Sequence, residues 1–335
     1  MESASAKKKH PILRVFATII AVLVVLVVAL SAIPLFESAD NAKVEGSADW
    51  MARLDDATPL NQVVLPGTHD AATQYVQLAF FAKCQSLSVP EQLEAGFRYL
   101  DIRLGDEGNS SSLKLMHGFT NCKTDVLGDV LRLDDVLAGC YAFLDAHPTE
   151  TIVFAVKQEH GDASVAQFQQ ILNTAIAKNP QRWLLTESIP TVGKARGKLV
   201  LLRRYDDEAG LGASAGIPFN WAGQGKSAGQ GLDVIAEPNG SFQLWVQDRY
   251  EYGNDDKWAA FTTGMRKAAE RMLPGDVALH FLSTKGTLVQ GHPFAHASDL
   301  NPRLAAVPST DLSGWIVVDF SSAPLAAHIY EANFS

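Results

Sequence analysis

Two histidines with acidic and basic neighbours have the side chains needed for acid–base chemistry. His69 is followed directly by Asp70, and His117 ends a short apolar segment further along the chain. Two imidazoles can divide the proton transfers of a displacement at phosphorus, because one can accept a proton from the attacking hydroxyl while the other gives one to the leaving oxygen. Cations neutralise the phosphoryl oxygens as charge develops. Such cations and further polar groups follow other apolar segments: Arg103, Lys157, Arg203, Arg204, Asp248, Ser283, Lys285 and Asp319.

Each of these groups has a simpler alternative role. A single histidine at the end of a strand is more often structural than catalytic, although two in matching positions favour catalysis. Asp70, Asp101 and Asp319 could cap loops or helices. Arg103 could be a partner in a buried ion pair. The functional interpretation therefore requires that the surrounding elements bring these side chains to one place.

Short runs rich in β-branched residues predict the strands that would do so. The eight candidates are Gln62–Leu65, Tyr99–Arg103, Leu113–Met116, Thr151–Val156, Lys198–Leu202, Phe242–Val246, Val277–Leu282 and Trp315–Val318. Between and after them, apolar residues three and four apart predict helices over Val126–Ala146, Ser164–Lys178, Lys257–Met272 and Pro324–Asn333. This alternation predicts an α/β fold, a (β/α)₈ barrel of the TIM type, in which active sites form at the C-terminal ends of the strands.

The predicted barrel cannot be regular. Parallel neighbours need a crossover of about a dozen residues, and only Leu104–Ser112 separates the second and third candidate strands. The Gly-rich stretch Asp206–Ser241 also lacks helical periodicity. We therefore expect an irregular barrel with one or more helices missing.

The N-terminal region is predicted to lie outside the barrel. A basic cytosolic tail, residues 1–14, precedes an apolar segment, residues 15–36, which is long enough to span a bilayer. The segment is either a retained transmembrane anchor or a cleaved signal, since Ala29-Leu30-Ser31 resembles a cleavage site. A linker over residues 37–49 and a barrel domain over residues 50–335 follow. Either alternative predicts an extracytoplasmic barrel, membrane-anchored or secreted.

Charge and cysteine content limit the partners. The chain has 28 Lys and Arg against 37 Asp and Glu, a net charge of −9, so nucleic acid is not expected as a partner. Its three cysteines are too few for a disulfide-built scaffold, although Cys84 and Cys122 could pair in an oxidising compartment, with Cys140 buried on a helix.

The local sequences around the histidines resemble the X domain of bacterial phosphatidylinositol-specific phospholipase C. The matching motifs occur in the order of that family over about residues 55–325: Leu65-Pro66-Gly67-Thr68-His69-Asp70, Tyr99-Leu100-Asp101-Ile102-Arg103, Leu115-Met116-His117-Gly118, Pro148-Thr149-Glu150-Thr151-Ile152 with Lys157, Gly197-Lys198-Leu199-Val200, Val246-Gln247-Asp248-Arg249-Tyr250 and Ile316-Val317-Val318-Asp319-Phe320. The resemblance implies cleavage of phosphatidylinositol, or of its glycosylated forms, to diacylglycerol and inositol 1,2-cyclic phosphate.

The resemblance also implies a role for each matched residue. His69, oriented by Asp319, would be the general base that deprotonates the inositol 2-hydroxyl, and His117, supported by Asp70, would be the general acid. Arg103 would stabilise the charge on phosphate. The inositol ring would be bound by four further residues: Lys157, Arg204, Asp248 and Tyr250. The implied partners are the phospholipid surface and the phosphatidylinositol headgroup, and a monomer is expected.

Arg103 indicates whether the site can hold a metal ion. Calcium-dependent relatives coordinate the ion with carboxylates around this position, where a fixed guanidinium would exclude Ca²⁺. We therefore expect no metal and no other cofactor. Two alternatives stay open: a non-catalytic member of the fold that binds lipid headgroups or a surface partner, and a metal-dependent glycerophosphodiester phosphodiesterase.

Overall fold

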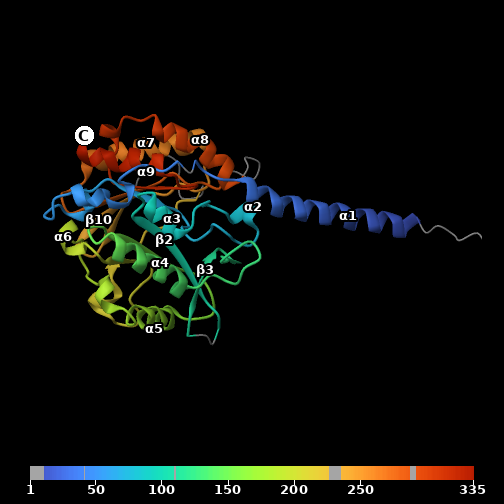
Figure 1. Cartoon of the computed structure of the whole chain (residues 1–335), viewed down its shortest axis with the longest axis horizontal. Helices are drawn as coiled ribbons and strands as arrows, with labels where there is room; N and C mark the ends of the chain where they lie inside the picture. The colour runs from blue at the N-terminus through green and yellow to red at the C-terminus, as the bar shows by residue number, and fades with distance from the viewer. Residues whose placement is uncertain (1–10, 41, 109–110, 226–234, 287–291) are drawn as a thin grey trace, which may run out of the picture.

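The computed structural model describes residues 11–40, 42–108, 111–225, 235–286 and 292–335. A single helix, α1 (Pro11–Ala32), projects from a globular body (Figure 1). The stretch Arg14–Phe36 is long and apolar enough to cross a membrane, with a mean hydropathy of 3.1, and signal sequences share these features. The assignment of residues 15–36 as anchor or signal therefore stays a prediction, as do the other proposed boundaries.

The body is built on one curled sheet. Its parallel strands are β1 (Leu65–Thr68), β2 (Tyr99–Asp106), β5 (Ile152–His160), β6 (Trp183–Leu184), β7 (Leu199–Arg203), β8 (Ile217–Pro218), β10 (Phe242–Gln247), β11 (Val277–Phe281) and β12 (Trp315–Val318). The strand order is β6-β7-β5-β2-β1-β12-β11-β10-β9, with β8 also on β7 and β9 (Ile235–Asn239) antiparallel to β10. The first and last parallel strands, β1 and β12, are neighbours, so the sheet curls round as a barrel does.

The curl is completed without a ladder. Among the described residues no strand pairing joins β8 to β9. Instead the Asn220 backbone amide donates to the Asn239 side chain, and the Asn239 side-chain amide donates to the Asn220 carbonyl. The predicted irregular TIM-type barrel is confirmed, with its irregularity concentrated at this point.

The third predicted strand was wrongly assigned to the barrel. β3 (Leu113–His117) is antiparallel to β2, and β4 (Thr120–Asn121) is antiparallel to β3. The short connection after Leu104 is therefore part of a hairpin, which needs no crossover helix. The first predicted strand, Gln62–Leu65, was placed too early, since β1 includes Pro66 and Gly67. A Cβ at Gly67 would lie 2.9 Å from the Tyr99 ring, so packing inside the barrel explains this poor strand former.

The helices are α2 (Ala79–Ala82), α3 (Val89–Glu94), α4 (Leu133–Ala146), α5 (Val165–Ile176), α6 (Val192–Ala195), α7 (Asn254–Arg271), α8 (Pro293–Ala305) and α9 (Ala323–Tyr330). The 3₁₀ turns η1 (Ile33–Phe36) and η2 (Ser47–Arg53) precede the barrel. Helices α4, α5, α7 and α9 confirm the four predicted segments, although α4 begins seven residues late. In the described part of the chain no α-helix lies between β7 and β10, as expected.

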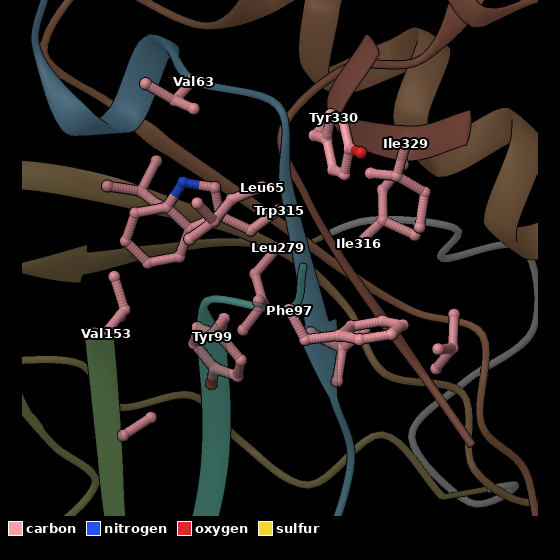
Figure 2. Close-up of a cluster of buried hydrophobic side chains, with 14 of the residues drawn as sticks. Val63, Leu65, Phe97, Tyr99, Val153, Leu279, Trp315, Ile316, Ile329 and Tyr330 are labelled. Atoms are coloured by element: carbon pink, nitrogen blue, oxygen red, sulfur yellow. The ribbon is translucent and has the colours of Figure 1, made fainter. Parts of the chain in front are cut away.

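Alternation along the strands separates the core into two layers. Tyr99 and Val153 face a cluster that includes the barrel interior, with Leu279 and Trp315 (Figure 2). Their neighbours Leu100 and Phe154 face a second cluster against the outer helices. The inward series continues from Tyr99 to Asp101 and Arg103. The same period of two that buries the apolar residues therefore points polar groups into the mouth of the barrel.

Candidate active site

A pocket of about 460 Å³ opens at the C-terminal ends of the strands. Its lining includes His117, the last residue of β3, and Lys157, within β5. Further polar residues of the lining follow β1, β7, β10, β11 and β12: His69, Arg204, Asp248, Tyr250, Ser283, Lys285 and Asp319. Arg103, on β2, lines it as well. Asp70 is buried beneath this surface. The structure thus brings together the nine residues predicted for the site.

His69 is held by a carboxylate on one ring nitrogen. Its Nδ1 lies 2.8 Å from Asp319 Oδ1, at the end of β12, while its Nε2 lies 2.8 Å from Arg103 Nη2. Burial disfavours the protonated form, but the carboxylates of Asp319 and Asp70 outweigh this effect, so the pKa of His69 lies above its ordinary value. With Nδ1–H donated to Asp319, Nε2 has the lone pair that a general base needs.

His117 faces His69 across the pocket. The two ring centroids are 6.2 Å apart and the rings are nearly perpendicular. His117 Nδ1 lies 2.8 Å from the carbonyl oxygen of Ala82, which fixes Nδ1–H as the donor and leaves Nε2 toward the pocket. Asp70 Oδ2 lies 3.5 Å from this Nε2 and 3.2 Å from His69 Nε2. Asp70 therefore contacts both imidazoles, where the sequence assigned it to His117 alone.

Arg103 stands at the centre of a charged network. Its Nε lies 3.0 Å from Asp70 Oδ1, and its Nη2 lies 3.0 Å from Asp101 Oδ2. Asp101 also pairs with Arg204, at 3.3 Å. Against the effect of burial, the two guanidinium groups hold the pKa of Asp101 well below its ordinary value. Asp101 is thus a buried counter-ion that fixes both arginines.

Glu159 is a further carboxylate of the site, and it was not predicted from the sequence. It accepts from Arg103 Nη1 at 3.4 Å and from the Gly118 amide at 3.0 Å, and it pairs with Lys157. Against its burial, Arg103 and Lys157 lower the pKa of Glu159 to about 2. Gly118 has φ of 57°, a left-handed conformation that favours glycine. Glu159 thereby ties the turn after His117 to the cations of β2 and β5.

The other side of the pocket has an aromatic support. The Arg204 guanidinium lies 3.5 Å from the centroid of the Trp221 ring, and Trp221 Nε1 donates to Asp248 Oδ2 at 3.0 Å. Arg203 points away, since its Nη1 donates to the Tyr205 carbonyl. Of the two adjacent arginines, Arg204 is therefore the one in the site. Trp221 lies in the long irregular connection, where no periodicity marked it.

The alternation of side chains along a strand could have identified two site residues that were not predicted. Asp101 lies two positions before Arg103 on β2, and Glu159 lies two positions after Lys157 on β5. Residues two apart share one face of a strand. Glu159 was missed because the predicted strand ended at Val156, whereas β5 continues to His160.

The cysteines are unpaired in the structure. Cys84, Cys122 and Cys140 are buried free thiols, so the suggested Cys84–Cys122 disulfide is not formed. Cys84 Sγ lies 3.8 Å from His117 Nδ1. Burial raises the pKa of this thiol well above its ordinary value, and the nearby carboxylates act in the same direction. Cys84 is therefore a protonated packing neighbour of the site.

Among the described residues, one group of side chains could ligate a metal ion together. Ligand atoms of His69, Asp70 and Cys84 lie within 4.8 Å of one another. The Arg103 guanidinium contacts both His69 and Asp70, so a positive charge already occupies the space beside two of the three ligands. This donor set suits an anion better than a cation, and the expectation of a metal-free reaction stays a prediction.

Comparison with known proteins agrees with this site. Residues 58–205 match the family described as "Phosphatidylinositol-specific phospholipase C, X domain". The chain is 29% identical over 290 residues to the 1-phosphatidylinositol phosphodiesterase of Staphylococcus aureus strain Newman, covering 82% of this chain and 88% of that protein. The protein of the same name from Listeria monocytogenes is 33% identical over 166 residues, covering 46% of this chain and 47% of that protein.

Solved structures show the same fold. A phosphatidylinositol-specific phospholipase C from S. aureus superimposes with a TM-score of 0.71 at 23% identity, covering 85% of this chain and 98% of that one. The corresponding structure from L. monocytogenes has a TM-score of 0.63 at 22% identity, covering 86% and 98%. Residues 58–205 thus match the X domain of the phosphatidylinositol-specific phospholipase C family, and the resemblance found in the sequence motifs is confirmed.

Proposed function

We propose that this chain is a metal-independent phosphatidylinositol-specific phospholipase C. It cleaves phosphatidylinositol, or glycosylated phosphatidylinositol, by attack of the inositol 2-hydroxyl on phosphorus. The observation that carries the proposal is the pair of imidazoles that face each other in one pocket, with a guanidinium in contact with His69 and with the Asp70 carboxylate that both imidazoles share. A protein that only bound headgroups would need the cations but not an acid and a base.

His69 is the general base. Arg103 Nη2 contacts the Nε2 lone pair of His69, and a bound substrate would replace this contact with its own 2-hydroxyl. Asp319 on Nδ1 keeps the ring in the reactive tautomer and stabilises the imidazolium that forms. Because the nucleophile belongs to the substrate, attack is intramolecular and the reacting atoms are already close.

His117 is the general acid. Its Nδ1 is committed to the Ala82 carbonyl, so its Nε2–H is available to the leaving diacylglycerol oxygen. Asp70 Oδ2 lies 3.5 Å from this Nε2 and supports the ring in its place. The Arg103 guanidinium, held by Asp101, Asp70 and Glu159, then stabilises the charge on the phosphoryl oxygens.

The far side of the pocket binds the inositol ring. Lys157, Arg204 and Asp248 supply donors and acceptors for its hydroxyls, and Tyr250 supplies an aromatic face. Trp221 holds Arg204 and Asp248 in position. The products are diacylglycerol and inositol 1,2-cyclic phosphate, which the two histidines can hydrolyse slowly with their roles exchanged.

The working environment is the outer surface of a membrane. Phosphatidylinositol in a bilayer is the substrate, and the apolar segment before the barrel anchors or exports the protein. The proposed active form is a monomer.

The deciding experiment is an assay of the purified chain on phosphatidylinositol vesicles with and without EDTA. Release of inositol 1,2-cyclic phosphate that the chelator does not change supports the proposal. Turnover that EDTA abolishes would indicate a metal-dependent phosphodiesterase instead. Binding of the vesicles without any turnover would indicate a headgroup-binding protein.

A further inference from the structure

The segment between α1 and the barrel is docked on the body rather than free. Lys83, which is 8% exposed, donates from Nζ to the carbonyl oxygens of Pro34 at 2.8 Å and Glu37 at 3.2 Å. The Ala39 amide donates to Ser86 Oγ at 3.1 Å. The docked residues Ile33–Asp40 are named the stalk below.

A second contact also fixes the stalk. The Glu37 side chain is buried, and its Oε1 lies 3.1 Å from His292 Nε2 at the start of α8. The seat is therefore formed by α2, the loop after it and α8, elements that are far apart in the sequence.

The seat depends on the stalk for its own hydrogen bonding. Lysine is almost never buried without partners, because an unpaired buried ammonium is costly. Both acceptors recorded for Lys83 Nζ are stalk carbonyls. The stalk therefore supplies the acceptors of a lysine that is buried at the contact between stalk and body, so the two surfaces fit each other.

The stalk leaves the body at the mouth of the pocket. It contacts α2, as α1 does, and Phe81 of α2 lines the pocket. In Figure 1, α1 departs beside α2, on the side of the body where β3 also lies. Large apolar side chains are exposed here, among them Phe36, at 86%, and Phe119, at 74%, which follows His117.

We propose that the stalk is a rigid mount that holds the barrel with its mouth against the bilayer that contains α1. The inference rests on the proposed function and on retention of α1. It makes the enzyme act on lipids of its own membrane in preference to those of another. A flexible linker of the same length would supply proximity but not orientation.

Two variants separate orientation from tethering. An insertion of about six Gly and Ser residues between Ala32 and Ile33 keeps the seat intact but uncouples it from the anchor. Lys83→Met removes the two hydrogen bonds to the stalk, and Lys43→Met, at an exposed position nearby, is its matched control. None of these positions belongs to the catalytic or inositol-binding set.

The first readout is activity in a mixture of two kinds of vesicle. Proteoliposomes carry the full chain and one labelled phosphatidylinositol, and protein-free vesicles carry phosphatidylinositol with a different label. We expect the wild type and Lys43→Met to cleave mainly the lipid of their own vesicle. The insertion and Lys83→Met should lower the ratio of own-vesicle to other-vesicle cleavage by about tenfold while keeping activity on micellar phosphatidylinositol. An unchanged ratio in both variants would overturn the proposal.

The second readout does not need activity. A fluorophore on Phe119→Cys should be quenched by a lipid-borne quencher, whereas the same label on Leu273→Cys, before the N-terminal end of β11, should not. The insertion should reduce the difference. The proposed mount would be contradicted by equal quenching at both positions in the chain without the insertion. It would also be contradicted if the mass of the chain extracted from membranes showed cleavage after α1. Absence of micellar turnover with the quenching difference intact would instead overturn only the proposed function.

Discussion

The two sides of the pocket are built differently. The catalytic side, on β1, β2 and β12, is a closed network in which the carboxylates of Asp70, Asp101 and Asp319 are at most 4% exposed. The inositol side is formed by Lys157, within β5, and by residues after β7 and β10, and the Lys157 side chain is 34% exposed. Its Arg204 rests on Trp221, from the irregular stretch where the barrel lacks a ladder. The reacting groups are therefore preorganised by buried charge, while the recognition groups depend on a loop.

The largest effects should come from the catalytic side. His69→Ala and His117→Ala should each lower kcat on phosphatidylinositol by about 10²–10⁴-fold, because each removes one proton transfer. His160→Ala, at an exposed histidine on the end of β5, is the matched control and should keep full activity. Thermal unfolding should show that all three variants fold. A variant of either site histidine with near-normal kcat would remove that residue from the mechanism.

Arg103→Lys should have the next largest effect, a fall in kcat of about 10²–10³-fold. Lysine keeps the positive charge but cannot contact His69, Asp70, Asp101 and Glu159 together from a planar fork. Arg132→Lys, at a solvent-exposed ion pair with Glu107, should leave kcat unchanged. Equal activity of Arg103→Lys and the wild type would show that charge alone suffices here.

Asp319→Asn should change the pH dependence as well as the rate. The Asp319 carboxylate helps to raise the pKa of His69, so its removal should lower that pKa. A general base acts in its neutral form, and the acid limb of kcat/KM should therefore move to lower pH while the maximum falls. Asp311→Asn, at an exposed aspartate, should keep the wild-type profile. A shift of the acid limb to higher pH would contradict the assignment of His69 as the base.

The inositol side should respond more weakly. Trp221→Phe removes the hydrogen bond to Asp248 but keeps an aromatic ring under Arg204, a loss of about 1 kcal/mol, or about fivefold in KM. Trp245→Phe, whose Nε1 bonds to Asp276 outside the pocket, is the matched control. A large fall in kcat with KM unchanged would place Trp221 on the catalytic side.

More of the fold than of the site could be predicted from the sequence. Short runs rich in β-branched residues found the principal parallel strands, and the polar residue after each predicted strand identified the residues around the mouth. Leu113–Met116 was misplaced because a hairpin strand and a parallel strand have the same local pattern, and only pairing distinguishes them. Helix α8 was not among the predicted helices, although it begins at Pro293 and proline is well suited to the first turn of a helix.

The missed site residues have a common physical cause. Asp101 and Glu159 share a strand face with Arg103 and Lys157, but each also pairs with an arginine on or just after another strand, and local sequence does not reveal that pairing. Trp221 reaches the pocket from a connection without periodicity. Its contacts with Arg204 and Asp248 form only in the folded barrel.

The most direct test of the central claim changes the leaving group. If His117 protonates the leaving oxygen, His117→Ala should regain most of the wild-type rate on a myo-inositol phosphodiester of 4-nitrophenol, whose leaving group needs no proton. His69→Ala should stay inactive on the same substrate, because its 2-hydroxyl still needs a base. Equal rescue of both variants, or rescue of neither, would contradict the division of proton transfers between His69 and His117.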